Sequence, residues 1–306
     1  MYTVNPEYQI QDRRGMTLSR RIEMFGRTAY QSWDKMDDDS DRRFCEKHAA
    51  HRSTFEGACM HLLVFSDYAE EISYFLTATD RKYLMIESLK SGGLLITGTV
   101  RALQEWINGD TGIGMRLQYF LHEFDPLLFP NFPGDGYSVE KSRTDVISVP
   151  PAAVVDLSAY PDKHLMVMVR FIVNRAVTHE LVRHRPCSFL QESQRYCRYN
   201  QERFGEEVTF IKPTAFYKEG TKEYSLWEKA MRGTEKIYLE LLKTSTPQAA
   251  RTTLPNSCKT ELCMYATVAE WRHVFKMRNN KACDPSMQEI MKPLARDFFQ
   301  NRIVWE

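Results

Sequence analysis

The spacing of apolar residues along the chain predicts a mixture of helices and short strands. Leu18, Ile22, Phe25 and Ala29 recur at three- and four-residue intervals, which predicts a helix over 16–30. By the same criterion, further helices are expected at 99–107, 112–122, 221–243 and from about 285. Short apolar runs between Gly, Asp and Ser predict strands at 62–65, 72–76, 83–86, 94–97, 164–173 and 208–211. We therefore expect an α+β fold, with a mainly antiparallel sheet flanked by helices.

Polar residues directly before several of these helices are expected to cap them. Ser40 or Asp41 would open a helix after an acidic run, and Thr178 would open a short helix within 178–182. Thr246, followed by a proline, and Asp284, also followed by a proline, have the sequence of an N-cap and a first helical residue.

Composition places the chain among ordinary soluble globular proteins. Of 306 residues, 43% are hydrophobic and 26% are charged. The 41 basic side chains nearly balance the 40 acidic ones, which argues against a nucleic-acid binder with a broad positive surface. No apolar run approaches the ~20 residues of a membrane helix, and no signal-peptide stretch opens the sequence. The seven cysteines have no C-x-x-C spacing, so we expect reduced thiols and a cytoplasmic protein without a membrane or nucleic-acid partner.

Prolines repeatedly interrupt the pattern between residues 109 and 162. We interpret about 70–160 as an elaboration within a single domain that spans 1–306. The apolar residues of this stretch would pack on the core, on a neighbouring subunit or on a substrate. They include Leu127, Leu128, Phe129 and Phe132.

Positive charge is concentrated in one short segment, residues 175–199, which holds five arginines against two glutamates. Within it, Arg183, His184 and Arg185 are followed after seven residues by Ser193. Arginine keeps its charge and offers a planar set of donors, which suits phosphate and other multiply charged anions. Without further signals, such a cluster is more often a solvated helix end.

The complete spacing R-H-R-x7-S, continued by Gln194-Arg195-Tyr196, resembles the signature of flavin-dependent thymidylate synthases. Two other parts of the chain resemble the same family in the same order. His51-Arg52-Ser53-Thr54-Phe55-Glu56 resembles a motif that precedes the family's first strand, although a turn or, with His48, half of a metal site are alternatives. Arg251-Thr252-Thr253-Leu254-Pro255 and the run from Glu270 to Arg278 resemble its C-terminal motifs.

The resemblance implies a fold, a reaction and a set of ligands. The fold would be that of the thymidylate synthase-complementing proteins. The reaction would be the reductive methylation of dUMP at C5 to give dTMP, with methylenetetrahydrofolate as carbon donor and NADPH-reduced FAD as hydride source. The family needs no covalent cysteine, and it forms homotetramers that share active sites between subunits.

The resemblance also implies roles for individual residues. Six would bind the flavin, namely Ser53, Glu56, Arg183, His184, Arg185 and His273. Six would bind the uracil nucleotide, namely Glu180, Gln191, Ser193, Arg195, Arg251 and Arg278. Catalysis would depend on His51, Ser193 and Arg278, and no metal is expected.

Four positions depart from the family pattern. Ala29 replaces a small polar residue, Gly57 replaces a histidine, and Thr267 and Ala269 stand where the family has Asn and Arg. Loss of a charged donor to the cofactor would weaken binding by ~1.5–3 kcal/mol if nothing replaces it. These changes leave two alternatives open, a C5-methylase of UMP or another uridine nucleotide and a non-catalytic nucleotide-binding relative.

Overall fold

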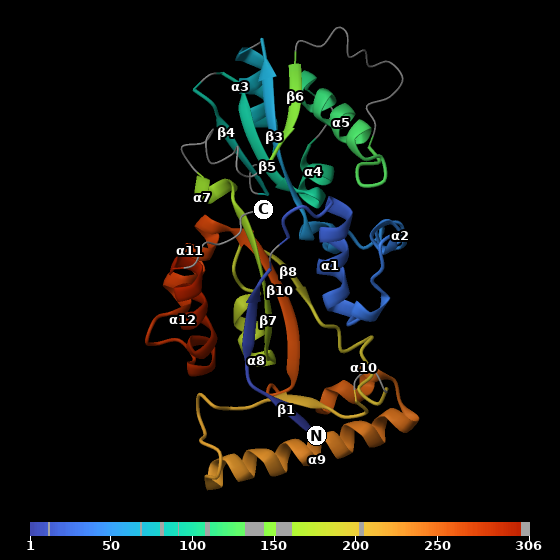
Figure 1. Cartoon of the computed structure of the whole chain (residues 1–306), viewed down its shortest axis with the longest axis vertical. Coiled ribbons are helices and arrows are strands. Elements are labelled where there is room, and N and C mark those ends of the chain that lie inside the picture. Colours follow the sequence, from blue (N-terminus) through green and yellow to red (C-terminus); the bar gives the residue numbers. More distant parts are fainter. Residues whose placement is uncertain are drawn as a thin grey trace.

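The computed structural model describes residues 1–11, 13–67, 69–79, 83–90, 92–107, 111–131, 144–150, 161–201 and 205–300. At its centre is an antiparallel sheet in the order β2-β7-β10-β8 (Figure 1). Its strands are β2 (Glu7–Ile10), β7 (Met166–Asn174), β10 (Lys259–Thr267) and β8 (Ser188–Gln191). The two long strands pair over their full length, from Lys259 opposite Asn174 to Thr267 opposite Met166.

The central sheet is covered on both faces, which explains why its two long strands are mainly apolar. Side chains alternate along a strand, so Val169 and Phe171 face one side while Met166 and Met168 face the other. The first side is covered by helices α8 (Arg175–Leu181), α11 (Val268–Arg278) and α12 (Pro285–Gln300). The second side receives Phe25 of helix α1 (Leu18–Tyr30).

A second antiparallel sheet has the order β4-β5-β3-β6. Its strands are β3 (Cys59–Ser66), β4 (Leu84–Ser88), β5 (Leu94–Thr99) and β6 (Thr144–Val149). Helices α3 (Ala69–Ala78), α4 (Val100–Trp106) and α5 (Gly112–Phe124) contribute to the core against it. The same core receives Ile22 of α1 and Phe44 of α2 (Ser40–Lys47), so α1 joins both sheets.

A third region lies at the opposite end of the central sheet (Figure 1). Strands β1 (Tyr2–Val4) and β9 (Thr209–Ile211) pair in parallel beside the long helix α9 (Lys222–Thr244). Trp227, Met231 and Tyr238 of α9 form a core with Phe210. The chain then passes through α10 (Pro247–Ala250) and the short 3-10 helix η5 (Arg251–Thr253) into β10. The remaining short elements are η1 (Trp33–Lys35), η2 (Arg52–Gly57) and α7 (Pro161–His164).

The mixed helix and antiparallel-sheet architecture agrees with the predicted α+β class, and most predicted elements are present. The strand predicted at 72–76 was wrong, because these residues lie inside α3. Its apolar residues also fit a helical spacing, and a run this short does not separate the two periods. The structure adds β6 within the proline-rich stretch, whereas Phe132 and much of that stretch lie outside the described residues.

Two helix caps lie at earlier residues than predicted. Thr178 lies inside α8, and Asn174 caps that helix by accepting a hydrogen bond from the Val177 amide at 2.9 Å. Ser40 is the first residue of α2 and follows Asp39 at the cap position. Thr246 caps α10 as predicted, and Asp284 accepts from the Ser286 amide at the start of α12.

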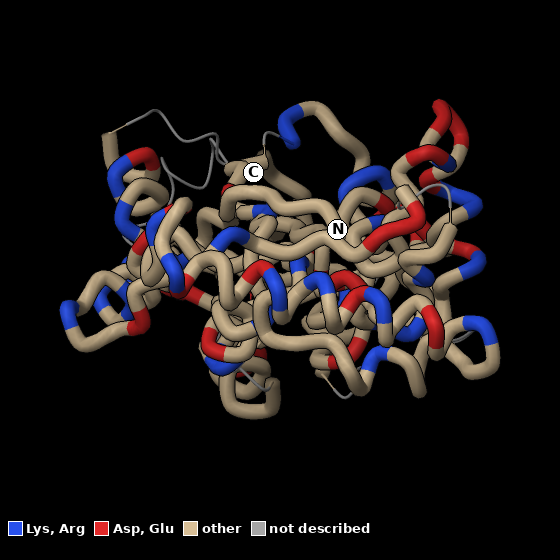
Figure 2. The backbone as a smooth tube through the Cα atoms, turned by 90° about the horizontal axis from the view of Figure 1, so that it is seen from below, with Lys and Arg blue, Asp and Glu red and all other residues tan. Residues whose placement is uncertain are grey.

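Basic and acidic residues are interspersed along the chain as seen from below (Figure 2), in keeping with a net charge of +1. Within the described residues, no helix combines the length and the hydropathy needed to cross a membrane.

Candidate functional site

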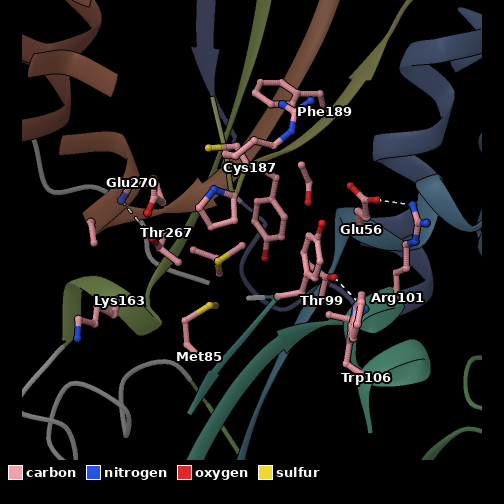
Figure 3. A pocket seen from close by; sticks show the side chains of 18 of the residues that line it. Glu56, Met85, Thr99, Arg101, Trp106, Lys163, Cys187, Phe189, Thr267 and Glu270 are labelled. Atoms are coloured by element: carbon pink, nitrogen blue, oxygen red, sulfur yellow. Dashed lines mark hydrogen bonds and ion pairs between the residues drawn. The ribbon is translucent and has the colours of Figure 1, made fainter. Parts of the chain in front are cut away.

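A pocket of about 690 Å³ lies between the two antiparallel sheets, a size typical of small-molecule sites. The central sheet supplies Phe189 and Tyr265 to it, together with the Arg185–Cys187 loop (Figure 3). The other wall comes from η2, β4, β5 and α4. Its members are Glu56, Tyr83, Met85, Thr99, Arg101, Ala102, Glu105 and Trp106.

Beside this pocket, the ends of α8 and α11 bring three predicted site residues together. Arg278 donates from Nη1 to the Glu180 carboxylate at 2.6 Å and from Nη2 to the Glu180 carbonyl at 3.0 Å. Its Nε lies 3.3 Å from Nε2 of His184. The guanidinium is therefore fixed by three contacts to one five-residue segment of the arginine-rich sequence.

The hydrogen bonds of His184 require a neutral imidazole. Nδ1 lies 2.9 Å from the Leu181 carbonyl, which accepts only, so Nδ1 carries the proton. Nε2 must then accept from Arg278. Burial lowers the pKa of His184, and the positive charges of Arg278, His273 and Arg183 lower it further, against the opposing effect of the Leu181 carbonyl.

The rest of the R-H-R triplet leads from this cluster to the pocket. Arg185 donates to the His184 carbonyl at 2.9 Å and to the Val182 carbonyl, and it lines the pocket with Pro186, to which it is joined by a cis peptide bond. Arg183 is exposed. The exposed His273 lies on α11, with its ring centre 6.5 Å from that of His184. Arg183, His184, Arg185, His273 and Arg278 thus form one neighbourhood.

Ser193 and Arg195 belong to a second neighbourhood, at the end of β8. The Ser193 amide donates to the Ala29 carbonyl of α1 at 2.9 Å, and its hydroxyl accepts from the Arg195 amide at 3.3 Å. The Arg195 guanidinium is exposed and lies 5.7 Å from the ring centre of Tyr196. The Gln191 amide group donates to the hydroxyls of Thr178 on α8 and Thr260 on β10 at 3.0 and 3.1 Å, so it links the sheet to α8.

A buried ionic network anchors the segment directly after β8, which carries Ser193. Lys259 on β10 lies 3.0 Å from Glu192 and 2.8 Å from Glu261. Arg170 on β7 donates from Nε to Glu261 at 2.8 Å, and the Tyr199 hydroxyl donates to Glu192 at 2.8 Å. These charges join β7, β10 and Glu192, the residue that follows β8, which fixes the backbone immediately before Ser193.

A row of aromatic rings connects this second neighbourhood to His51. Tyr196 lies 5.7 Å from Tyr30, Tyr30 lies 5.3 Å from His48, and His48 lies 6.1 Å from His51 between ring centres. His51 and Ser53 are both exposed at the start of η2. Within the described residues, no group of three or more His, Cys, Asp or Glu side chains is arranged to hold a metal ion.

The remaining predicted residues lie apart from these two groups. Glu56 lines the pocket and accepts from Arg101 at 2.6 Å. Arg251 is exposed on η5, and within the described residues no hydrogen bond or ion pair joins it to another predicted site residue. One chain therefore brings together Glu180, His184 and Arg278, and separately Ser193, Arg195 and His51, but not all predicted residues at one point.

Comparison with known proteins concerns the part of the chain that carries these clusters. Residues 160–301 match the sequence model of the family described as thymidylate synthase complementing protein. The resemblance to flavin-dependent thymidylate synthases is confirmed. A flavin-dependent thymidylate synthase of Pyrococcus abyssi is 37% identical over 118 residues, which are 38% of this chain and 46% of the relative. One of Corynebacterium efficiens is 31% identical over 134 residues, 39% of this chain and 51% of the relative. The chain thus spans about half the length of the curated relatives it matches.

The stretch that matches the family's sequence model, residues 160–301, forms only one wall of the pocket. Arg185, Phe189, Tyr265 and Glu270 lie within residues 160–301, whereas the wall formed by η2, β4, β5 and α4 lies outside this range. Of this second wall, the family resemblance predicted only Glu56. Trp106 of α4 faces the pocket and stacks on Tyr83 at 5.0 Å between ring centres. The four-residue spacing of Arg101 and Glu105 was the only local signal of the charged group there.

Two departures from the thymidylate synthase pattern have structural reasons. Thr267 caps α11 by accepting from the Glu270 amide at 3.1 Å, a role that asparagine also fills. A Cβ at Gly57 would lie 2.3 Å from Cβ of Phe25, so a histidine side chain does not fit there unless α1 moves. Ala269 lines the pocket, and Ala29 contributes its carbonyl to Ser193.

Two titratable pocket residues are shifted towards their neutral forms. Burial raises the pKa of Glu270, against the opposing effect of His273. Burial also raises the pKa of Cys187 to about 12, helped by the charge of Glu270 and opposed by Arg185. Cys187 is therefore a thiol at neutral pH, not a thiolate nucleophile.

Proposed function

We propose that the protein catalyses the flavin-dependent reductive methylation of dUMP at C5 to give dTMP. Methylenetetrahydrofolate would donate the carbon and NADPH would reduce the FAD. The observation that carries this proposal is the R-H-R-x7-S segment. It lies within the region that matches the family, and its loop lines a pocket of about 690 Å³. The similarity to proteins named flavin-dependent thymidylate synthases supports the same reaction class.

The pocket has the chemistry that a flavin ring requires. Its apolar side chains suit the face of a planar ring system, and Arg185 supplies donors for ring carbonyl oxygens. Glu56 and Arg185 would hold the flavin within the pocket. Ser53, Arg183, His184 and His273 remain the proposed flavin residues outside it. When bound, the flavin would supply the hydride after its reduction by NADPH.

Arg278 is proposed to act on the uracil base. A guanidinium fixed in advance stabilises negative charge on a carbonyl oxygen without reorganising during the reaction. Glu180 and neutral His184 provide this fixation, at 2.6 and 3.3 Å from the guanidinium. Glu180 is thereby proposed to orient Arg278, and Gln191 to support the strand that leads to Ser193.

The exposed arginines Arg195 and Arg251 are proposed to bind the nucleotide phosphate, with the Ser193 hydroxyl as a positioning group. Exposed guanidinium groups suit phosphate because they can form paired hydrogen bonds to its oxygens. His51 would complete the folate and flavin side. Since one chain keeps these groups apart from Arg278, we propose a homotetramer in which different subunits contribute to each active site.

The proposal is tested on the purified full chain. It should bind FAD, with flavin absorption that persists after gel filtration. It should oxidise NADPH and form dTMP when dUMP and methylenetetrahydrofolate are both present. The control lacks dUMP, to separate methylation from flavin oxidation by oxygen. A protein that remains colourless and binds no added FAD would contradict the proposal.

The second candidate substrate is UMP, because a wall outside the family match contributes to the pocket. Turnover of dUMP and UMP measured side by side separates the two, and failure of UMP alone removes this candidate. The non-catalytic alternative rested on four altered positions, of which Thr267 and Gly57 have structural roles. It would be supported by tight dUMP binding without dTMP formation.

A further inference from the structure

The pocket wall formed by α4 and η2 carries an ion pair whose position is set by a well-capped helix. Thr99 caps α4 by accepting from the Ala102 amide at 3.2 Å, which fixes the first turn and with it Arg101. Arg101 donates from Nη1 to Glu56 at 2.6 Å and from Nε to Glu105 at 3.1 Å. Arg101, Glu56 and Glu105 all line the pocket, and Figure 3 shows the pair of Glu56 and Arg101 along one side.

The charge of this group favours a neutral polar ligand over a simple anion. Two carboxylates flank one guanidinium, which leaves the group negative if all three are ionised. Elsewhere the pocket lining adds the bases Lys163 and Arg185 and the acid Glu270, so positive and negative side chains are balanced. A wall with balanced charges attracts an anion only weakly. A ligand with both donors and acceptors can instead form hydrogen bonds to both Arg101 and Glu56.

The side chains beside the ion pair suit the face of a planar ring. Trp106, also on α4, stacks on Tyr83 with an angle of 20° between the rings, and Met85 lies on the adjacent strand. The arrangement therefore combines an apolar surface with adjacent N–H donors and carboxylate acceptors. An imide or amide ring edge, in which carbonyl and N–H groups alternate, is complementary to that combination.

We propose that Arg101, with Glu56, binds the imide or amide edge of a planar heteroaromatic ring, and that the wall outside the family match thereby helps to select the ligand. The inference rests on the proposed function, whose ligands include three such rings: the flavin, the uracil and the pterin of the folate. Arg101 is a binding residue in this proposal, held in place by Thr99 at the start of α4 and by the two carboxylates.

The test compares binding to the wild type and to Arg101→Met, which keeps an unbranched apolar side chain but removes the guanidinium donors. Isothermal titration with FAD, dUMP and tetrahydrofolate, each measured separately, identifies which ring is bound. We expect Arg101→Met to raise Kd at least about tenfold for one of the three ligands and to leave the others within about twofold. Arg101→Lys should give a smaller increase for the same ligand, since it keeps the charge but not the planar set of donors.

Arg52→Met is the matched control. Arg52 approaches the same Glu105, at 3.6 Å, but is more exposed and does not line the pocket. This control should bind all three ligands as the wild type does. If Arg101→Met does not fold, as judged by its thermal transition, the Arg101→Lys comparison decides.

The outcomes separate the two proposals. A wild type that binds FAD and dUMP, with Arg101 variants that bind all three ligands equally well, overturns the role of Arg101 and leaves the proposed function standing. A wild type that binds no flavin removes the proposed function and the role of Arg101 with it.

Discussion

Arg278 is the candidate site residue whose role is indicated most clearly by its contacts. Its guanidinium is held by Glu180 and His184, so its direction is set before any ligand enters. The same segment continues through Arg185 into the pocket. Because its proposed target is the uracil base, a change at Arg278 should act on the nucleotide more than on the flavin.

We predict that Arg278→Ala lowers kcat by about 10²–10³-fold, the usual effect of removing one fixed donor to a developing oxyanion. FAD affinity should stay close to that of the wild type. Arg272→Ala is the control, because Arg272 lies on the same helix but is exposed and pairs with Asp162 at 2.6 Å. Steady-state turnover and FAD titration of both variants make the comparison. Unchanged kcat in Arg278→Ala would contradict the assignment.

The neutral state of His184 gives a prediction for the pH dependence. Its pKa is lowered below the ordinary value of 6.5, first by burial and then by the neighbouring Arg278, His273 and Arg183. At pH values above this lowered pKa, the neutral imidazole accepts a hydrogen bond from Arg278. As the pH falls through the lowered pKa, Nε2 gains a proton and the contact is lost.

We therefore expect an acidic limb in kcat/KM with a midpoint below 6.5, and a loss of about tenfold per pH unit beneath the midpoint. His184→Gln supplies an acceptor that does not titrate, so this variant should lack that limb while keeping part of the activity. If the acidic limb of kcat/KM keeps its midpoint and slope in His184→Gln, the titration belongs to another group.

At the scale of elements, the start of α11 shows how a departure from the family motif can be structurally conservative. Thr267 ends β10 and caps α11, and Glu270 one turn later lines the pocket. The cap thus positions the pocket side chains of α11 as well as stabilising the helix. Threonine and asparagine both accept from an amide at this position.

We predict that Thr267→Ala lowers the free energy of unfolding by about 1 kcal/mol, the usual cost of losing an N-cap. Thr267→Asn should remain close to the wild type because it keeps a capping oxygen. Urea denaturation of the three proteins tests this. Equal midpoints for Thr267→Ala and the wild type would show that the hydrogen bond of 3.1 Å contributes no net stability.

Elements with a long, regular pattern were predictable from the sequence. The helix at 221–243 corresponds to α9, because it keeps the helical period over many residues. The strand at 164–173 corresponds to β7, because it is a long apolar run rich in branched residues. Strand β8 was missed, since its four half-buried residues show no alternation. The run at 72–76 was misassigned because five residues fit either period.

In the candidate site, residues that belong to motifs were predictable from the sequence, whereas contacts between distant segments were not. The motif spacing predicted Glu180, His184 and Arg278 for one site, and the fold does place them in contact. The pairing of Arg101 with Glu56 joins residues 45 positions apart, and it exists because η2 packs against α4. No periodicity in the sequence encodes such a contact.

At the scale of the whole molecule, the pocket depends on how the two sheets are held together. Helix α1 contributes Ile22 to one core and Phe25 to the core facing the other sheet. A second connection is polar and buried. His61 on β3 lies 2.7 Å from the His164 carbonyl, and Thr97 on β5 lies 2.8 Å from Nδ1 of the His164 ring.

This buried histidine pair should make the stability of the protein sensitive to acid. His164 is fully buried, and burial lowers its pKa from 6.5 to about 4, with further lowering by His61 and Lys163. Burial also lowers the pKa of His61. Between pH 6.5 and 4 the unfolded chain binds a proton at His164 that the folded protein excludes, so stability falls as the pH falls through this window.

The shift of His164 corresponds to about 3 kcal/mol of unfolding free energy lost between pH 7 and pH 4. Glutamine at position 164 can still form a hydrogen bond with Thr97 but does not titrate. We therefore predict that, between pH 7 and pH 4, the unfolding free energy of His164→Gln falls by about 3 kcal/mol less than that of the wild type. Urea denaturation at pH 7 and at successive values down to pH 4 measures the difference, and subtracting the two proteins removes the contribution of the carboxylates. His179→Gln, at an exposed position on α8, should follow the wild type. Parallel pH profiles for the wild type and His164→Gln would mean that the contact between the sheets relaxes enough to hydrate His164 when it gains a proton.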